Sequence, residues 1–201
     1  EEVPPAIPAF LPGLPDGAPK NRLGFARWLV SPDNPLIGRV IMNRHWEAFF
    51  GRGIVKTLED FGFQGELPSH AEFLDWLAIE FRKRGWAQKQ MDKLIVMSAT
   101  YQQTSAVTEE LRQRDQLNVL LARGPRFRVE AEIVRDYALV ASGLFSDKLG
   151  GPSVYPPQPA GISTEGAYGP LQWKVSEGPD RYRRGLYTFA KRTTPFAMTS
   201  T

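Results

Sequence analysis

Hydrophobic side chains recur every three to four residues through most of the chain between positions 21 and 145. This spacing is typical of amphipathic helices, which bury one face and expose the other. It predicts six helices, at residues 21–30, 36–50, 69–84, 87–101, 108–122 and 129–145. Because every long periodic segment in this range has the helical period, we expect one helical bundle without an internal sheet.

Polar and glycine residues mark the expected ends of these helices. Asn21 is a favourable residue before a first turn, and Gly51 is a favourable residue after a last one. Ser69, followed by Glu72, matches the capping box, in which each side chain accepts a hydrogen bond from the other residue's backbone N–H. We therefore expect Ser69 to begin the third helix.

The two ends of the chain lack the helical period. Six prolines lie within residues 1–20 and predict an extended arm or linker, because proline has a fixed φ and no backbone donor. Residues 150–180 are rich in glycine and proline, and such a long irregular segment is typical of a functional or partner-covered loop. Short runs of strand-forming residues at 171–175 and 182–190 predict a small β-hairpin.

The expected organisation is therefore a mainly α-helical protein with one folded domain. Residues 1–20 form the proline-rich arm, and residues 21–201 form the domain. Within the domain, we expect a helical core at residues 21–149 and an irregular part with short strands at residues 150–201.

The composition excludes several classes of site. The chain contains no cysteine, so it has no disulfide, no thiolate metal ligand, no thiol nucleophile and no covalently attached haem. With only His45 and His70, a site of several histidines is impossible, and no metal site is expected. The formal net charge of +3 is too small to indicate a nucleic-acid partner. No stretch approaches the roughly 20 apolar residues of a membrane span.

Motifs that would identify an enzyme are incomplete. Asp60, Phe61 and Gly62 spell the metal-binding triplet of protein kinases, but the glycine-rich loop, strand lysine and catalytic-loop aspartate of that signature are missing. None of the serines lies in a Gly-x-Ser-x-Gly turn. The sequence therefore assigns no catalytic residue and leaves enzymatic activity undecided.

Arg44 is expected in a place where a charge is costly. At about 100° per residue, it lies within roughly 20–40° of the line through Ile37, Ile41 and Ala48 on the second helix. A guanidinium keeps its proton, so a buried one needs a carboxylate or several carbonyls around it. One interpretation is a buried ion pair that joins two helices, and the other is a cleft arginine that awaits an anionic ligand.

Neighbouring and acidic residues complete this candidate cluster. His45 follows Arg44 on the same helix, and acidic residues on other elements that could pair with Arg44 are Glu59, Asp60, Glu130 and Asp136. The carboxylate of Glu130 could instead cap the sixth helix. The apolar arc of that helix consists of Val129, Ile133, Tyr137, Val140 and Leu144. Its opposite side, with Glu132, Arg135 and Asp136, is typical of a solvated salt-bridge cluster.

Two further features suggest contacts with a ligand. Trp173 lies in the irregular region, apart from the tryptophans on helices, and is a candidate for stacking on a ligand. Arg181, Arg183 and Arg184 belong to a segment, residues 174–192, that has six basic and two acidic residues. A solvated basic face is one interpretation of this segment, and a polyanion-binding surface is the other.

Short segments along nearly the whole chain resemble a known family. They lie at residues 22–29, 34–36, 43–46, 50–55, 60–62, 74–78, 98–102, 130–132, 135–136 and 182–187. In this order they are similar to the planctomycete-specific domain of unknown function catalogued as fifteen fifty-three. That family has no established activity and no assigned catalytic residues, so the resemblance supplies none for this chain.

The resemblance does imply a context. Similar proteins are large and exported, and they carry this domain at the C-terminal end, behind a cytochrome-c-like domain and a companion domain. The resemblance therefore implies an extracytoplasmic location, periplasmic or at the cell surface. It also implies other domains of the same parent protein as partners, and haem in a neighbouring domain with no cofactor in this chain. The family pattern continues beyond Thr201, so part of the domain is expected to lie outside this chain.

Three functions are compatible with the sequence. The missing catalytic motifs favour a non-catalytic interaction or scaffold domain of a larger exported protein. A carbohydrate-active or carbohydrate-binding domain would use acidic residues, with Trp173 stacking on a polysaccharide, and would need two carboxylates facing one cleft. A polyanion-binding domain would use the basic segments at residues 20–56 and 174–192, and the small net charge argues against it.

Overall fold

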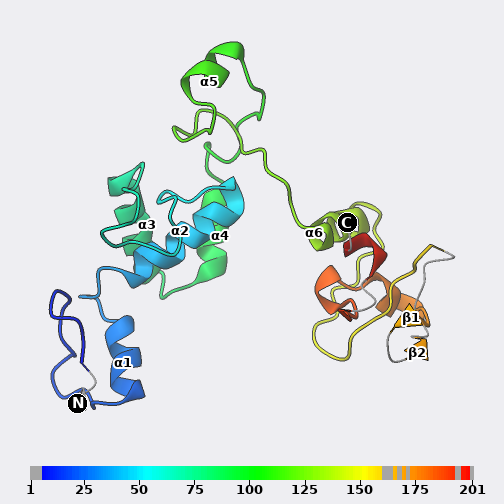
Figure 1. Cartoon of the computed structure of the whole chain (residues 1–201), viewed down its shortest axis with the longest axis horizontal. Helices are drawn as coiled ribbons and strands as arrows, with labels where there is room; N and C mark the ends of the chain where they lie inside the picture. Colours follow the sequence, from blue (N-terminus) through cyan, green and yellow to red (C-terminus); the bar gives the residue numbers. More distant parts are fainter. Residues whose placement is uncertain (1–5, 160–164, 167–168, 171–172, 193–195, 200–201) are drawn as a thin grey trace. The chain divides into compact units, whose positions relative to one another are not determined.

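A computed structural model describes residues 6–159, 165–166, 169–170, 173–192 and 196–199 of the protein (Figure 1). Within these residues the chain is mainly helical, as the hydrophobic pattern predicts. The six α-helices are α1 (Arg22–Leu29), α2 (Ile37–Phe50), α3 (Ala71–Lys83), α4 (Gln88–Val96), α5 (Glu109–Arg114) and α6 (Ala131–Ala141). The described 3-10 turns are η1 (Gly178–Tyr182), η2 (Gly185–Tyr187) and η3 (Ala197–Thr199). No helix in these ranges is long and apolar enough to cross a membrane.

The chain divides into two compact units, at Glu1–Phe127 and Arg128–Thr201. They are the N-terminal unit and the C-terminal unit below. This division falls before α6, whereas the sequence placed the border between the helical core and the irregular part at residue 149. The sequence predicted one bundle of all six helices. In the structure α6 belongs to the C-terminal unit, and the other five helices belong to the N-terminal unit.

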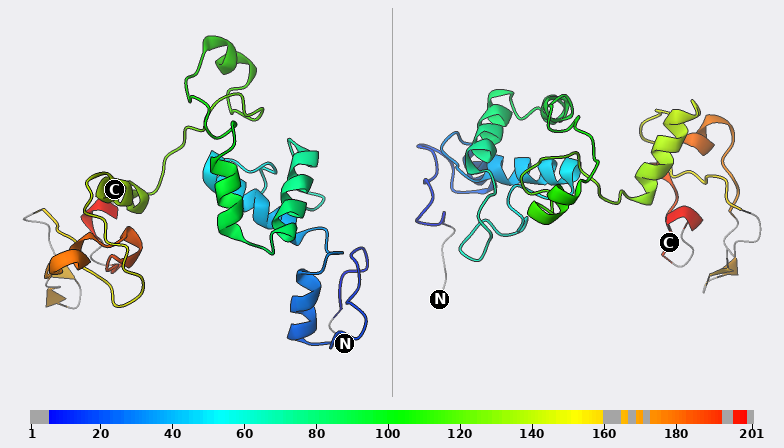
Figure 2. Two further views of the ribbon diagram at one scale, coloured as in Figure 1. Left: turned by 180° about the vertical axis from the view of Figure 1, so that it is seen from behind. Right: turned by 90° about the horizontal axis from the view of Figure 1, so that it is seen from above.

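The core of the N-terminal unit lies where α2 packs between α3 and α4 (Figure 2). Its buried side chains are Met42, Trp46, Phe50, Ile54, Val55, Leu74, Leu77, Phe81, Met91 and Ile95. Trp46 stacks on Phe50 with the ring centroids 4.0 Å apart. Gly38 of α2 lies against Ala78 of α3, where an added Cβ would be 3.2 Å from the Ala78 Cβ. The small size of both residues therefore lets the two helices approach closely.

The expected ends of the first two helices are confirmed. Asn21 Oδ1 accepts hydrogen bonds from the backbone N–H groups of Leu23 and Gly24, at 3.0 and 3.2 Å, and so caps α1. Gly51 ends α2 in the left-handed conformation, with φ at 73°, which glycine adopts without a steric penalty.

The capping box at Ser69 is wrong. α3 begins at Ala71, and His70 precedes it without a capping side-chain hydrogen bond. Ser69 contacts the loop after α2 instead, because both its hydroxyl and its backbone N–H donate to the carbonyl of Ile54, at 3.1 and 2.9 Å. A tertiary contact therefore competes successfully with the local capping bond.

α5 is shorter than the predicted helix at residues 108–122. Thr108 caps its start by accepting a hydrogen bond from Leu111 N at 3.2 Å. The helix ends before Asp115, whose carboxylate accepts the backbone N–H groups of Val119 and Leu120, both at 2.8 Å. This side chain offers the backbone an alternative to further helical turns. The segment after α5 is consequently an ordered loop.

Part of the proline-rich arm belongs to the folded N-terminal unit. Trp28, which is buried on α1, donates from Nε1 to the carbonyl of Pro12 at 2.6 Å. Gly24 lies so close to the arm that an added Cβ would be 1.8 Å from the carbonyl oxygen of Pro19. A larger residue at position 24 would therefore separate the arm from α1.

Arg39 of α2 and Asp75 of α3 form an ion pair at the contact between these helices, with Nε and Oδ1 2.6 Å apart. The hydrogen bond from Arg39 lowers the pKa of the Asp75 carboxyl below its ordinary value of 3.8. The same bond raises the pKa of Arg39. The pair therefore favours the ionised form of both groups in the folded state.

We expect Asp75→Asn to remove a small, pH-dependent part of the stability. A carboxyl whose pKa is lower in the folded state stabilises the fold above the unfolded pKa, and this contribution is lost as the pH falls through the folded pKa. Because both side chains are partly exposed, it amounts to at most about 1 kcal/mol. Urea denaturation should show the variant below the wild type at neutral pH and equal to it in strong acid. An equal difference at both pH values would contradict this explanation.

The β-hairpin predicted from residues 171–175 and 182–190 is wrong. Residues 178–182 and 185–187 form the 3-10 turns η1 and η2, and residues 171–172 lie outside the described part of the chain. Within the second predicted strand, the N–H groups of Tyr187 and Thr188 donate to carbonyls three residues earlier, those of Arg184 and Gly185, at 2.9 and 3.0 Å, so local turns take the place of a ladder.

Other, shorter pairings occur in the C-terminal unit. Two single parallel bridges join Ser146 to Arg183 and Val154 to Thr188. An antiparallel ladder joins β1 (Glu165–Gly166) to β2 (Gly169–Pro170), with two residues in each strand. Apart from this two-residue ladder, single bridges and side-chain hydrogen bonds connect the described segments of this unit.

Candidate functional site

Arg44 is not buried. Its side chain is 53% exposed and pairs with Glu59, which is 83% exposed, at 2.9 Å. Arg44 therefore has an acidic partner, as predicted, but the prediction that its side chain is buried is wrong. The buried face of α2 runs through Gly38, Met42 and Trp46, one residue along from the expected line, because α3 packs closely at Gly38. An exposed pair of this kind contributes about 0–1 kcal/mol to stability.

The other members of the predicted cluster each have local contacts. His45 Nδ1 lies 3.1 Å from Asp92 Oδ1 and links α2 to α4. Asp60 closes a turn by accepting the backbone N–H of Gly62 at 2.7 Å. Glu130 precedes α6 without a capping bond from its carboxylate. No ion pair among the described residues joins two of Arg44, His45, Asp60, Glu130 and Asp136. A ligand-binding role for these residues stays a prediction.

Asn43, which is not among the candidate site residues from the sequence, organises the loop after α2. It is completely buried, and its amide donates to the carbonyl of Val55 at 2.9 Å and accepts the N–H of Val55 at 2.8 Å. Gly53 packs on this amide, since an added Cβ would lie 2.8 Å from Asn43 Nδ2. A polar residue inside the buried face of a helix, followed by closely spaced glycines, is the signal that could have indicated this contact.

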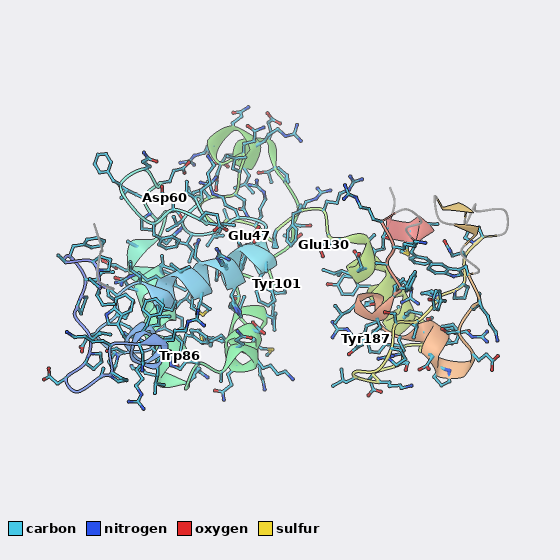
Figure 3. All side chains as sticks on the ribbon, turned by 60° about the horizontal axis from the view of Figure 1, so that its bottom comes forward. Glu47, Asp60, Trp86, Tyr101, Glu130 and Tyr187 are labelled. Carbon is cyan, nitrogen blue, oxygen red and sulfur yellow. The ribbon has the colours of Figure 1, made fainter. Side chains whose placement is uncertain are left out.

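This loop forms one wall of a cleft in the N-terminal unit with a volume of about 830 Å³. Residues 116–118 and 123–127, after α5, also line the cleft, as does Glu47 of α2, which is labelled in Figure 3. The volume is in the range of sites for small ligands. Of the described residues that line it, the basic ones are Arg52, Lys56, Arg112, Arg123 and Arg126, and the one acid is Glu47. Apolar lining residues are Phe50, Leu58, Val107, Leu117, Pro125 and Phe127.

The basic residues of the cleft are only partly neutralised. Arg52 and Lys56 share one carboxylate, that of Glu66, at 3.9 and 2.8 Å. Arg112 lies 3.7 Å from Glu109. Within the described part of the chain, no carboxylate lies at ion-pair distance from Arg126 or from Arg123. The cleft therefore keeps an excess of positive charge.

Arg123 is a structural part of the cleft wall. It is 7% exposed and donates to the carbonyls of Asp115 and Gln116, at 3.0 and 2.8 Å. Its own carbonyl accepts a hydrogen bond from Asn118 Nδ2 at 2.8 Å. These bonds hold the segment after α5 as a rigid wall around a buried cation.

The predicted basic surface at Arg181, Arg183 and Arg184 is largely absent. Arg183 is completely buried, and its guanidinium lies 3.9 Å from the ring centroid of Tyr187. It donates to the carbonyls of Lys148, Gly150 and Pro152. Arg184 is half-exposed and pairs with Asp136 at 3.4 Å. Arg181 lies over the ring of Tyr182, at 5.8 Å. The guanidinium groups of this segment therefore make contacts within the C-terminal unit and do not form an open basic surface.

The polar side of α6 faces inward and binds this same segment. Arg135 is buried and donates to the carbonyls of Arg183 and Arg181, at 2.6 and 3.0 Å. Burial lowers the pKa of Arg135, while the neighbouring Asp136 acts in the opposite direction. Asp136 accepts the backbone N–H of Gly185 at 2.6 Å. The predicted solvated cluster on α6 is therefore wrong, since these charges hold the C-terminal unit together.

The apolar side of α6 is consequently exposed. Its large side chains range from 39% to 66% exposed, and they are Ile133, Val134, Tyr137 and Val140. Leu144, just beyond the helix, is 49% exposed. Ala138 and Ala141 are exposed between them, and no exposed residue of α6 itself is charged. These seven residues are named the α6 apolar face below.

Trp173 belongs to an aromatic cluster of the C-terminal unit. Its ring stacks on Phe196, with centroids 5.8 Å apart and planes 8° apart, and meets Tyr155 edge-on at 5.1 Å. Its Nε1 donates to the carbonyl of Pro156 at 2.7 Å. Because Phe196 covers one face of the indole, only a partial surface is available to a stacking ligand. The described residues contain no group of three His, Cys, Asp or Glu side chains arranged for a metal ion.

Comparison with known proteins adds one finding to this geometry. The profile of a family described as a protein of unknown function (DUF1553, PSD1) matches residues 21–201. No curated protein and no solved structure matches the chain significantly. The match begins at Asn21, which caps α1, and covers most of the N-terminal unit and all of the C-terminal unit.

Proposed function

Because the chain belongs to the DUF1553 family of proteins of unknown function, we propose a function from its surface: it is a non-catalytic interaction domain of a larger protein. The α6 apolar face binds another domain of the same parent protein. The observation that supports this proposal is the orientation of α6, which turns its charges inward and its apolar side chains outward.

The composition of the α6 apolar face suits a permanent partner. Transient interfaces are about as polar as the rest of a protein surface, whereas permanent ones resemble a domain interior and are depleted of charge. A contiguous exposed patch without charge usually marks such an interface. The connection within one polypeptide keeps the effective concentration of a neighbouring domain high, so such a domain can occupy this face most of the time.

The described carboxylates offer little support for a carbohydrate-active enzyme. Glycoside hydrolysis needs an acid and a second carboxylate on either side of the bond that is broken. Among the described residues that line the cleft of the N-terminal unit, Glu47 has no second acid beside it. Asp136 binds a backbone N–H and an arginine, and Trp173 packs on Phe196. A non-catalytic role agrees better with these contacts.

The wider setting of the proposal rests on the sequence motifs. Their resemblance to a planctomycete-specific family suggests an exported parent protein, an extracytoplasmic location and a cytochrome-c-like neighbour that would carry any haem. The absence of cysteine is compatible with oxidising and reducing compartments alike. Fractionation of cells that produce the tagged parent protein would test the location.

We expect Val140→Glu to loosen this domain in the full-length parent protein. A carboxylate in the centre of an apolar interface is desolvated without a partner, so limited proteolysis should release the domain about tenfold faster or more. Leu149→Glu is the matched control, because Leu149 is 78% exposed in the same unit and lies outside α6. Its release rate should stay that of the wild type.

Two results would contradict the proposal. Equal release rates of the two variants would show that the α6 apolar face contacts no other domain. If the 201-residue chain alone forms a dimer that Val140→Glu dissociates, the partner is a second copy of the chain. Light scattering after size exclusion distinguishes this result from the expected monomer.

A further inference from the structure

We propose that the cleft of the N-terminal unit binds a peptide segment that carries acidic and apolar side chains. This inference goes beyond the α6 apolar face and depends on none of its residues. It rests on the charge of the cleft, on its apolar walls and on one buried polar atom, which together select this ligand chemistry.

The charge of the cleft selects an anionic partner. Arg126 is exposed at the cleft and has no ion-pair partner among the described residues. Arg52 and Lys56 compete for the single carboxylate of Glu66, so a ligand carboxylate would give one of them a partner of its own. Charge-assisted hydrogen bonds from arginine to a carboxylate are short and directional.

The apolar walls favour a peptide over a carbohydrate. Leu117 is 67% exposed and Phe127 is 45% exposed, and both line the cleft. Leucine or phenylalanine side chains of a ligand would bury this surface, whereas sugar hydroxyl groups placed against it would lose their hydrogen bonds to water. Nucleic-acid sites stack successive bases on several aromatic rings, and Phe127 is the one aromatic lining residue here that is substantially exposed.

Asn118 adds a hydrogen-bond acceptor at the cleft wall. Its side-chain oxygen is buried and has no hydrogen-bond partner among the described residues, while its amide nitrogen binds the carbonyl of Arg123. A buried polar atom without a partner is costly, so a ligand donor would favour a side-chain movement that brings this oxygen to the surface of the cleft. A peptide backbone has an N–H donor at nearly every residue, whereas sulfate groups and the dianion of a phosphate monoester have none.

Fluorescence anisotropy with a defined probe tests this inference. The probe is a fluorescein-labelled peptide of alternating Glu and Leu residues, and its control has Gln in place of Glu. The 201-residue chain should bind the acidic probe at least about tenfold more tightly than the control, and the affinity should fall as salt is added. A heparin hexasaccharide and inorganic phosphate serve as competitors.

Variants assign the binding to the cleft. Arg126→Glu should weaken the acidic probe about tenfold or more, because it replaces an attractive charge with a repulsive one. Lys89→Glu, an equal change of charge at an exposed position of α4 outside the cleft, should leave the affinity within about twofold. Leu117→Ser tests the apolar wall and should weaken the same probe. Circular dichroism of each variant confirms that it is folded.

Three results would overturn the inference. The first is failure of the acidic probe to bind the folded wild-type chain, and the second is an equal effect of Arg126→Glu and Lys89→Glu on its affinity. Complete displacement by heparin or phosphate at equal concentration would show a general anion site instead of a peptide site. Val140→Glu should leave this binding unchanged, so failure of this inference and failure of the proposed function give different results.

Discussion

Replacement of Asn43 by leucine should lower the free energy of unfolding by about 2–5 kcal/mol. The expected loss is large because the Asn43 amide pairs with both the N–H and the carbonyl of Val55, and both residues are buried. Each buried backbone group that loses its partner costs about 1–3 kcal/mol. A leucine has a similar volume but offers neither a donor nor an acceptor. Urea denaturation, followed by tryptophan fluorescence and circular dichroism, measures the change.

Met42→Leu is the matched control for Asn43→Leu. Met42 is the preceding residue of α2 and is also completely buried, but its role is apolar packing. A swap of nearly equal volume in a core usually costs less than about 1.5 kcal/mol. The two substitutions therefore separate the lost hydrogen bonds from disturbed packing. A similar loss in both variants would contradict the role assigned to the Asn43 amide.

Replacement of Arg183 by methionine should destabilise the C-terminal unit by about 3 kcal/mol. The substitution removes charge-assisted hydrogen bonds to three backbone carbonyls, each worth about 1.5–3 kcal/mol in a buried setting. It also removes the contact of the guanidinium with the ring of Tyr187. Some carbonyls can be hydrated after the change, since residues 148, 150 and 152 are exposed, which limits the loss. Thermal unfolding followed by calorimetry measures the change in midpoint.

Arg184→Met provides the comparison for Arg183→Met at the adjacent position. Arg184 is half-exposed and pairs with Asp136 at 3.4 Å, so its removal should cost about 1 kcal/mol or less. The loss of stability in Arg183→Lys should lie between those of the two methionine variants. Lysine keeps the charge, but it cannot reach all three carbonyls and has no planar guanidinium to stack on Tyr187. Equal midpoints for Arg183→Met and Arg184→Met would refute the structural role of the buried guanidinium.

The local signals in the sequence identified the first helices well. Asn21 and Gly51 act within one turn of their own helices, so residue type alone determines what they can do. The orientation of α2 was harder to predict, because the apolar line through Ile37 and Ile41 is close to the face that is buried. The close approach of Gly38 to Ala78, forty residues away in the chain, decides between them.

The candidate site was harder to predict for the same physical reason. The polar residues of α6 resemble a solvated face, yet Arg135 and Asp136 bind backbone groups of a segment more than forty residues later. A hydrophobic pattern contains no information about acceptors that a distant turn brings into position. The cleft likewise depends on Arg123 and on the loop that Asn43 holds, and both are tertiary contacts.

The hydrogen bonds of Arg183 have a consequence for comparisons among related sequences. Its acceptors are main-chain oxygens at positions 148, 150 and 152, and these remain when the side chains there change. Pairs of positions that vary together across a family reveal contacts between side chains. The contact between Arg183 and these main-chain oxygens should therefore produce no correlated variation between position 183 and positions 148, 150 or 152. The backbone path is what constrains variation, since Gly150 and Gly151 have φ values of 72° and 88°. Glycine at these two positions, together with arginine at 183, is the pattern by which relatives with the same arrangement can be recognised.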